Sequence, residues 1–334
     1  MSKVIVHVGQ MKSGTTYVQE ILSKNRVGLL QQNIVYPGGW LNQQPAVYGI
    51  CGSSVPWVKD KKPYQAKADK LRDEIRDAKD KGHDVLLSAE ALSSCDEEGI
   101  ESFLDFIGGA DRVIFSVRSL HKTLPSAWQQ ILKTGSYISI MEFFQQMDNT
   151  WNEKSGRWQT YAYGECIKRW SKFLPINTYV LPNKIITPKD PWNLFCSAAG
   201  LSDISDAIYP AKEENTSFSK ESSDIIRVLS KNAYERGLDS FKVAVWYFDK
   251  FITGSKFKGG KIKPPIDFLE KVSFWSRDQT DLLNSLSDFV FGDVGFLTEL
   301  DENLYEEFED MAFLNDALLA QYVEHVISCY IKCN

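Results

Sequence analysis

The sequence predicts an α/β protein built on a parallel sheet of about five strands flanked by helices, with a helical C-terminal extension. Short runs rich in valine and isoleucine alternate with segments of helical periodicity. These runs are mostly apolar, as expected for strands that helices cover on both faces. Polar residues follow the ends of several runs, which is where ligands bind in parallel α/β sheets.

The individual elements follow from these periodicities in order. The expected strands are the apolar runs at 4–8, 33–36, 84–90, 112–117 and 177–181. The expected helices lie at 15–31, 64–81, 97–107, 121–133, 140–151, 161–173, 192–199, 220–236 and 239–251. Residues 40–63 are rich in Gln, Pro, Gly and Ser and are expected to form a long loop near the site. From Ile266 onwards the chain is expected to be helical.

The chain of 334 residues is long enough for one large domain or two modest ones. It has no internal repeat or clear linker, so we expect a single domain over 1–334, with a core of about 1–220 and a helical extension of about 220–334. A formal net charge of -6 argues against a general nucleic-acid binder. No apolar run approaches the ~20 residues of a membrane span, and no signal peptide precedes the first strand. We therefore expect a cytoplasmic protein with no membrane or nucleic-acid partner; the sequence specifies no oligomeric state.

The first apolar run leads directly into a glycine-bearing loop suited to anions, which makes the predicted sheet P-loop-type. The loop reads Gly9-Gln10-Met11-Lys12-Ser13-Gly14-Thr15-Thr16. Backbone N–H groups in such a loop, and the N-terminus of the following helix, can hold a phosphate. The loop is not a Walker A motif, because Thr15 stands where that motif has lysine and Lys12 lies two residues before Gly14. The alternative is a strand-to-helix turn with incidental Ser and Thr.

A second candidate for anion binding follows the fourth expected strand. Arg118 closes the run Arg112–Val117, and Ser126 lies eight residues later in the next expected helix. An arginine at a strand end can bind a phosphate through two parallel hydrogen bonds, with the serine hydroxyl as a further donor. Taken alone, each residue would be read as a surface ion pair or a helix-start residue. Two anion-binding patterns in one chain are more specific than either one.

These stretches together resemble the sulfotransferases that use 3′-phosphoadenosine 5′-phosphosulfate (PAPS), and most closely their bacterial branch. The resemblance rests on HVGQMKSGTTYVQ, VLLSAEALS, VRSLHKTLPSAWQQ and ENTSFS; it is firm over 3–32 and 84–132 and thinner over 160–220. It implies that Arg118 and Ser126 bind the 3′-phosphate of the donor, that no metal is needed, and that PAP is the product. It also implies that the 5′-phosphosulfate end is bound by Gln10, Met11, Lys12, Ser13, Gly14, Thr15 and Thr16.

The sequence departs from the family pattern at three places. Met11 stands where the animal cytosolic enzymes have proline before the loop lysine. No histidine follows the third strand, where those enzymes have a catalytic one; Glu90 ends this strand instead, and His121 is the rival candidate for the base. The late Arg-Lys-Gly phosphate loop is also missing, and the lysine-rich segment 256–261 is a candidate replacement.

The resulting expectation is sulfuryl transfer to a hydroxyl or amine of a small-molecule or carbohydrate acceptor, with Lys12, Glu90 and His121 as the candidate catalytic residues. Aromatic side chains could line the acceptor pocket or complete the core edge: Trp40, Tyr48, Trp57, Trp128, Trp158, Tyr161 and Tyr163. Two other functions stay open. One is a P-loop small-molecule or nucleoside kinase, and the other is a non-catalytic nucleotide-binding protein.

Overall fold

The computed structural model describes residues 2–184, 187, 189–204, 207–209, 219–252, 261–307 and 316–333. Its contacts divide the chain into two compact units. The first unit comprises Met1–Leu120, Asn152–Glu214 and Ser273–Glu299, and it contains the sheet. The second comprises His121–Trp151, Asn215–Val272 and Leu300–Asn334. The division does not fall near residue 220, because segments from both sides of that position contribute to each unit.

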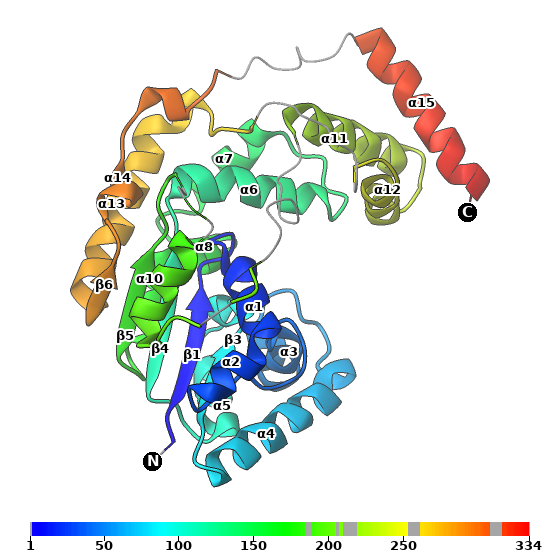
Figure 1. Cartoon of the computed structure of the whole chain (residues 1–334). Coiled ribbons are helices and arrows are strands. Elements are labelled where there is room, and N and C mark those ends of the chain that lie inside the picture. Colours follow the sequence, from blue (N-terminus) through cyan, green and yellow to red (C-terminus); the bar gives the residue numbers. More distant parts are fainter. Residues whose placement is uncertain are drawn as a thin grey trace. The chain divides into compact units, whose positions relative to one another are not determined.

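A parallel sheet with the strand order β2-β3-β1-β4-β5-β6 forms the centre of the first unit (Figure 1). Its strands are β1 (Val4–Gly9), β2 (Ile34–Val35), β3 (Asp84–Ser88), β4 (Arg112–Val117), β5 (Ile176–Val180) and β6 (Phe289–Phe291). All five pairings are parallel, and Val6 of β1 lies opposite Leu87 on one side and Val113 on the other. The predicted α/β class with a parallel sheet is thus confirmed. The structure adds a sixth strand, β6, in a region that we expected to be helical.

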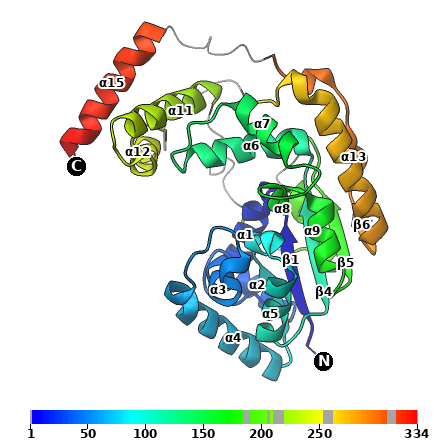
Figure 2. The ribbon, with the colours of Figure 1, turned by 180° about the vertical axis from the view of Figure 1, so that it is seen from behind.

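Helices cover both faces of this sheet, which explains why its strands are mostly apolar. The first unit contains α1 (Thr15–Lys24), α2 (Arg26–Gln31), α3 (Gln44–Cys51), α4 (Gln65–Asp80), α5 (Glu97–Ile107), α8 (Trp158–Tyr161), α9 (Tyr163–Trp170), α10 (Asp190–Ala199) and α14 (Gly295–Thr298). α1 and α10 share one buried cluster with Leu86 of β3, Ile114 of β4 and Tyr179 of β5. α9 packs on the opposite face of the sheet, beside α5 (Figure 2).

Two expectations about the first 63 residues are wrong. The helix expected at 15–31 is interrupted at Asn25, whose side chain bonds to Ile21 O at 2.7 Å and to Ile208 O at 3.0 Å. The region expected as a long loop contains α3 and two short 3-10 helices, Gly52–Ser54 and Lys62–Tyr64. α3 is eight residues long and contains Pro45 in its first turn, where the missing N–H costs no helical hydrogen bond. The proline and glycines that indicated a loop therefore mark the ends of a short helix.

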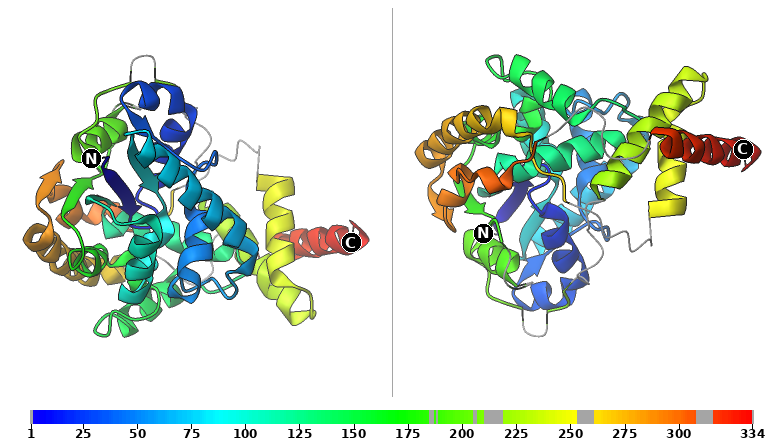
Figure 3. Two further views of the ribbon diagram at one scale, coloured as in Figure 1. Left: turned by 90° about the horizontal axis from the view of Figure 1, so that it is seen from below. Right: turned by 90° about the horizontal axis from the view of Figure 1, so that it is seen from above.

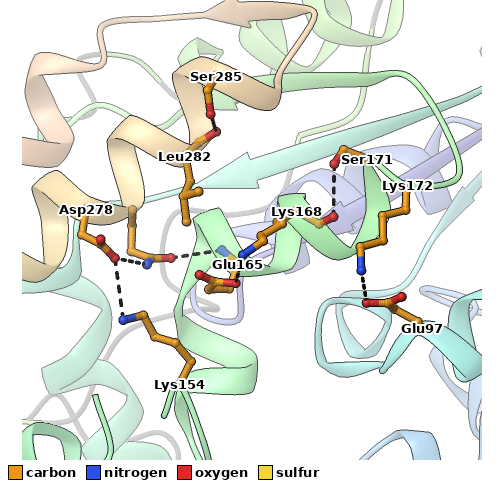
Figure 4. Close-up of polar contacts among 10 residues, drawn as sticks. Glu97, Lys154, Glu165, Lys168, Ser171, Lys172, Asp278, Leu282 and Ser285 are labelled. Carbon is orange, nitrogen blue, oxygen red and sulfur yellow. Dashed lines mark hydrogen bonds and ion pairs between the residues drawn. The ribbon is translucent and has the colours of Figure 1, made fainter. Parts of the chain in front are cut away.

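The helix α13 (Leu269–Leu286) packs closely on α9, within the part of α13 that belongs to the first unit (Figure 4). A Cβ atom at Gly164 would lie only 2.6 Å from Gln279 O, so a glycine is needed at this contact. The N–H of Glu165 donates to Gln279 Oε1 at 3.1 Å, and Lys154 Nζ lies 3.7 Å from Asp278 Oδ2. The predicted C-terminal extension is therefore partly integrated with the sheet.

The second unit is built mainly of helices. They are α6 (Leu120–Leu132), α7 (Ile140–Asn149), α11 (Lys220–Glu235), α12 (Ser240–Tyr247) and α15 (Asp316–Cys333). α15 lies against α11 and α12 (Figure 3), and the rings of Trp246 and Tyr330 meet edge to face at 5.5 Å. Among the helices that the structure describes, none is both long and apolar enough to span a membrane. Residues 256–260 of the lysine-rich segment, and 214–218 of ENTSFS, lie outside the described residues.

Candidate functional site

The loop between β1 and α1 is tightly folded against the neighbouring strand β4. A Cβ atom at Gly9 would lie 2.1 Å from Thr15 Cγ2 and 2.3 Å from Ser116 Oγ, so only glycine fits at the end of β1. Gly14 has φ +77°, and α1 begins at the next residue. Lys12 has φ +68°, a conformation that costs a side-chain-bearing residue roughly 1–2 kcal/mol. Such strain persists only where surrounding contacts enforce it.

Glu90 supplies one of these contacts. It follows β3, and its Oε1 accepts a hydrogen bond of 2.8 Å from the backbone N–H of Lys12. The Thr15 hydroxyl is a second hydrogen-bond partner of the same carboxylate. The carboxylate of Glu90 thus holds the loop from the side of β3.

The site lies where the order of the strands reverses. β3 lies on one side of β1 and β4 on the other, so the loops after β1 and β4 leave the sheet next to each other. In open parallel sheets this is where ligands bind. Arg118, immediately after β4, points its Nη1 at Lys12 O, 3.5 Å away. Lys12 and Arg118 therefore bring two cationic side chains to the switch point, with one carboxylate beside them.

Gln10 connects the loop after β1 with the residues that follow β4. Its Nε2 donates to Tyr161 O at 3.0 Å, and its Oε1 accepts from the backbone N–H of Arg118 at 3.0 Å. Its own N–H donates to Ser116 O at 2.9 Å. The side chain is fully buried. Both polar atoms of the Gln10 side chain thus bond to the protein, next to Arg118 and the start of the loop, and the expected contact of Gln10 with the donor stays a prediction.

Burial sets the electrostatics of the site. Burial raises the pKa of Glu90, while the N–H and charge of Lys12 and the hydroxyl of Thr15 oppose the rise. Burial likewise lowers the pKa of Lys12, with the charge of Glu90 opposing it, and lowers the pKa of Arg118. Desolvated cations gain from a bound anion, because an opposite charge replaces the lost water. The site therefore favours an anionic ligand.

The predicted site residues divide between the two units. Lys12, Glu90 and Arg118 lie together in the first unit, with the loop residues Met11, Ser13, Gly14, Thr15 and Thr16. His121 and Ser126 lie in α6, within the second unit, and their participation stays a prediction. His121 is largely buried. Among the residues described, no three His, Cys, Asp or Glu side chains form a metal-binding group.

The aromatic candidates for the acceptor pocket have different surroundings. Trp158 is fully buried against Trp275, 5.0 Å between ring centroids, and Tyr163 is fully buried, so both belong to the core. Tyr48 and Trp57 are different: Trp57 is 42% exposed, and its Nε1 donates to Tyr48 Oη at 3.1 Å. Burial raises the pKa of Tyr48, and the charge of Glu90 adds to the rise. Tyr48 and Trp57 therefore form a partly exposed aromatic pair, and their place in an acceptor pocket stays a prediction.

Two polar core residues that connect to the loop, Ser116 and Tyr179, were not identified from the sequence. Ser116 lies within an otherwise apolar strand and bonds to Ser13, Oγ to Oγ, at 2.7 Å. Tyr179 hydrogen-bonds with His7 and Ser116. In the sequence, these residues are noticeable only as one serine and one tyrosine within two apolar runs, 112–117 and 177–181. His7 is also a buried core residue.

The comparisons with known proteins give one similar structure. No family model matches the chain, and no curated protein matches it. A sulfotransferase from Alicyclobacillus acidocaldarius of known structure is similar, with 13% sequence identity and a TM-score of 0.39. The match covers 74% of this chain and 96% of that protein. The functional argument below therefore rests on the geometry of the site.

Proposed function

We propose that this chain is a sulfotransferase that moves a sulfuryl group from PAPS to a hydroxyl or amine of a small-molecule or carbohydrate acceptor. The observation that carries the proposal is the Lys12 loop at the switch point, with Arg118 leaving the adjacent strand and Glu90 bonded to the amide of Lys12. In this arrangement Lys12, Arg118 and the N-terminus of α1 can bind an anion. The buried carboxylate of Glu90 can accept a proton.

The residues present fit a donor with an anionic group at each end. The 5′ end would be held by Lys12, Thr15, Thr16 and the N-terminus of α1, which favours negative charge. Arg118 would hold the 3′-phosphate. The close fit at Gly9 keeps the loop near the strand ends, so that its N–H groups can reach the ligand. When bound, the donor supplies a sulfuryl group activated by its anhydride link to phosphate.

Glu90 is the base in this proposal. It takes the proton of the acceptor hydroxyl or amine as the oxygen or nitrogen bonds to sulfur. Lys12 stabilises the negative charge that develops on the departing phosphate oxygen, as preorganised cations do in group-transfer enzymes. The raised pKa of Glu90 makes its carboxylate a stronger base than an exposed one. His121 is the alternative base, and loss of turnover in a His121→Ala variant but not in a Glu90→Gln variant would assign the role to it.

Ligand binding tests the proposal before any acceptor is known. PAP at 100 times its Kd should stabilise the protein by about 2.7 kcal/mol, which raises Tm by about 4 °C for a chain of 334 residues. Lys12→Ala should abolish this shift, whereas Lys81→Ala, on the exposed end of α4, should retain it. Stabilisation by ATP with Mg²⁺ but not by PAP would refute the proposal and favour a kinase.

A further inference from the structure

A chain of buried hydrogen bonds runs beneath the anion-binding loop. It starts at Ser13, whose Oγ lies 2.7 Å from Ser116 Oγ. Ser116 in turn hydrogen-bonds with the hydroxyl of Tyr179, which lies 3.1 Å from His7 Nε2. All four side chains are at most 1% exposed. The chain thus links the loop to three adjacent strands, β4, β5 and β1.

The series of hydrogen bonds continues from the other ring nitrogen of His7. His7 Nδ1 lies 2.8 Å from Ser88 Oγ, which also accepts a hydrogen bond of 3.0 Å from Gln19 Nε2. Asn42 Nδ2 donates to Gln19 Oε1 at 2.9 Å, and Asn42 Oδ1 accepts from the N–H of Gln44, the first residue of α3, at 3.1 Å. This series of hydrogen bonds therefore runs from Ser13 in the loop to Gln44 at the start of α3, the helix that contains Tyr48.

Burying these polar side chains in the core costs free energy of folding. A buried polar group costs free energy unless it is hydrogen-bonded, and an apolar core at the same sites would need no such partners. A neutral imidazole donates from one nitrogen and accepts at the other, so it connects two hydroxyls in a fixed direction. Burial keeps His7 in this neutral form by lowering its pKa to about 3. Fully satisfied networks of this kind hold their members in one arrangement.

We propose that Tyr179 and His7 are positioning residues that act through Ser116 to hold Ser13, and with it the anion-binding loop, in the conformation that binds the ligand. Neither residue touches the ligand in this arrangement. The use of PAP as the ligand rests on the proposed function, but the effect on the loop itself does not.

A single atom can be removed to test this. Tyr179→Phe deletes the central hydroxyl and retains the ring in the core. Tyr163→Phe is the matched control, since the buried Tyr163 hydroxyl bonds to Ser276 O at 3.1 Å and to Thr280 Oγ1 at 2.9 Å, away from the loop. Both variants lose one buried hydroxyl.

Hydrogen exchange of the free protein gives the ligand-independent readout. The N–H groups of Lys12 and Ser13 are hydrogen-bonded, to Glu90 and to Gln10 O, and should exchange slowly in the wild type. In Tyr179→Phe they should exchange roughly tenfold faster, as expected for a lost contact of about 1.4 kcal/mol, whereas in Tyr163→Phe they should not. Equal loop exchange in the two variants would overturn the proposal.

Calorimetry with two nucleotides adds the link to binding. PAP carries the 5′-phosphate that the loop would hold, and adenosine 3′-phosphate lacks it. Tyr179→Phe should weaken PAP binding by roughly tenfold and leave adenosine 3′-phosphate unchanged. Ser116→Ala should have the same effect, and the double variant should lose no more than the larger single loss, because both break one chain. Additive losses would overturn the proposal. Failure of the wild type to bind PAP would refute the proposed function alone, and hydrogen exchange would still decide the role of Tyr179.

Discussion

Replacing His7 with glutamine should flatten the acid side of the stability profile of this protein. The pKa of His7 is lowered by burial from 6.5 to about 3 in the folded chain. Below pH 6.5 the unfolded chain therefore takes up a proton that the folded chain does not accept. Stability is full above pH 6.5 and falls by about 1.36 kcal/mol for each pH unit below it. This contribution reaches about 2 kcal/mol at pH 5 and about 5 kcal/mol near pH 3, where the folded form also becomes protonated.

Urea unfolding at pH 7 and at pH 5, followed by tryptophan fluorescence, measures this contribution. His7→Gln will itself lower stability at pH 7, because two buried hydrogen bonds are altered. The informative quantity is the difference between wild type and variant, which should shift in favour of the variant by about 2 kcal/mol between pH 7 and pH 5. For the control Tyr163→Phe this difference should not change, since its hydroxyl does not titrate in this range. A constant difference for His7→Gln would refute the reasoning that His7 is buried in its neutral form.

Three further substitutions test the site and the fold. Glu90→Gln keeps an oxygen that can accept a hydrogen bond from the Lys12 N–H, so the affinity for PAP should be retained. Because the variant has no base at this position, steady-state assays should find turnover reduced by roughly 100-fold or more. Turnover equal to that of the wild type would exclude Glu90 as the base. Gly9→Ala should abolish PAP binding in calorimetry, because its methyl group would clash with Thr15, and normal affinity would contradict the tight loop. Gly164→Ala should lower Tm by about 5 °C in a thermal melt through its contact with α13 while PAP affinity stays the same; an unchanged Tm would show that α13 yields easily.

The sequence predicted the centre of the fold because its strands of five or six residues are mostly apolar and buried. The runs at 84–90, 112–117 and 177–181 match β3, β4 and β5 to within two residues at each end. β6 was missed because it has three residues and an exposed first position, so no periodicity distinguishes it from the helix before it. α3 was missed because its composition resembles that of a loop.

The candidate site was predictable to the extent that it consists of strand ends. Lys12, Glu90 and Arg118 each follow a recognisable apolar run, and parallel pairing brings such ends to one edge of the sheet. The contact between Ser116 and Tyr179 was not predictable in this way. It depends on the register of β4 against β5, which places Ser116 opposite Tyr179, and a shift of β5 by one residue would turn Tyr179 to the other face of the sheet. Apolar patterns alone do not specify that register when both faces are buried.

The late position of β6 has a consequence for how the chain is made. β5 pairs with it at Asn177 and Phe289, so its outer edge has no strand partner until more than a hundred further residues have left the ribosome. Unpaired strand edges pair readily with other chains, and pairing across such a distance is slow. A fragment cut near residue 220 would keep this edge exposed permanently. In nascent chains of this protein the outer edge of β5 is therefore a site of aggregation until β6 is made, unless chaperones bind the chain.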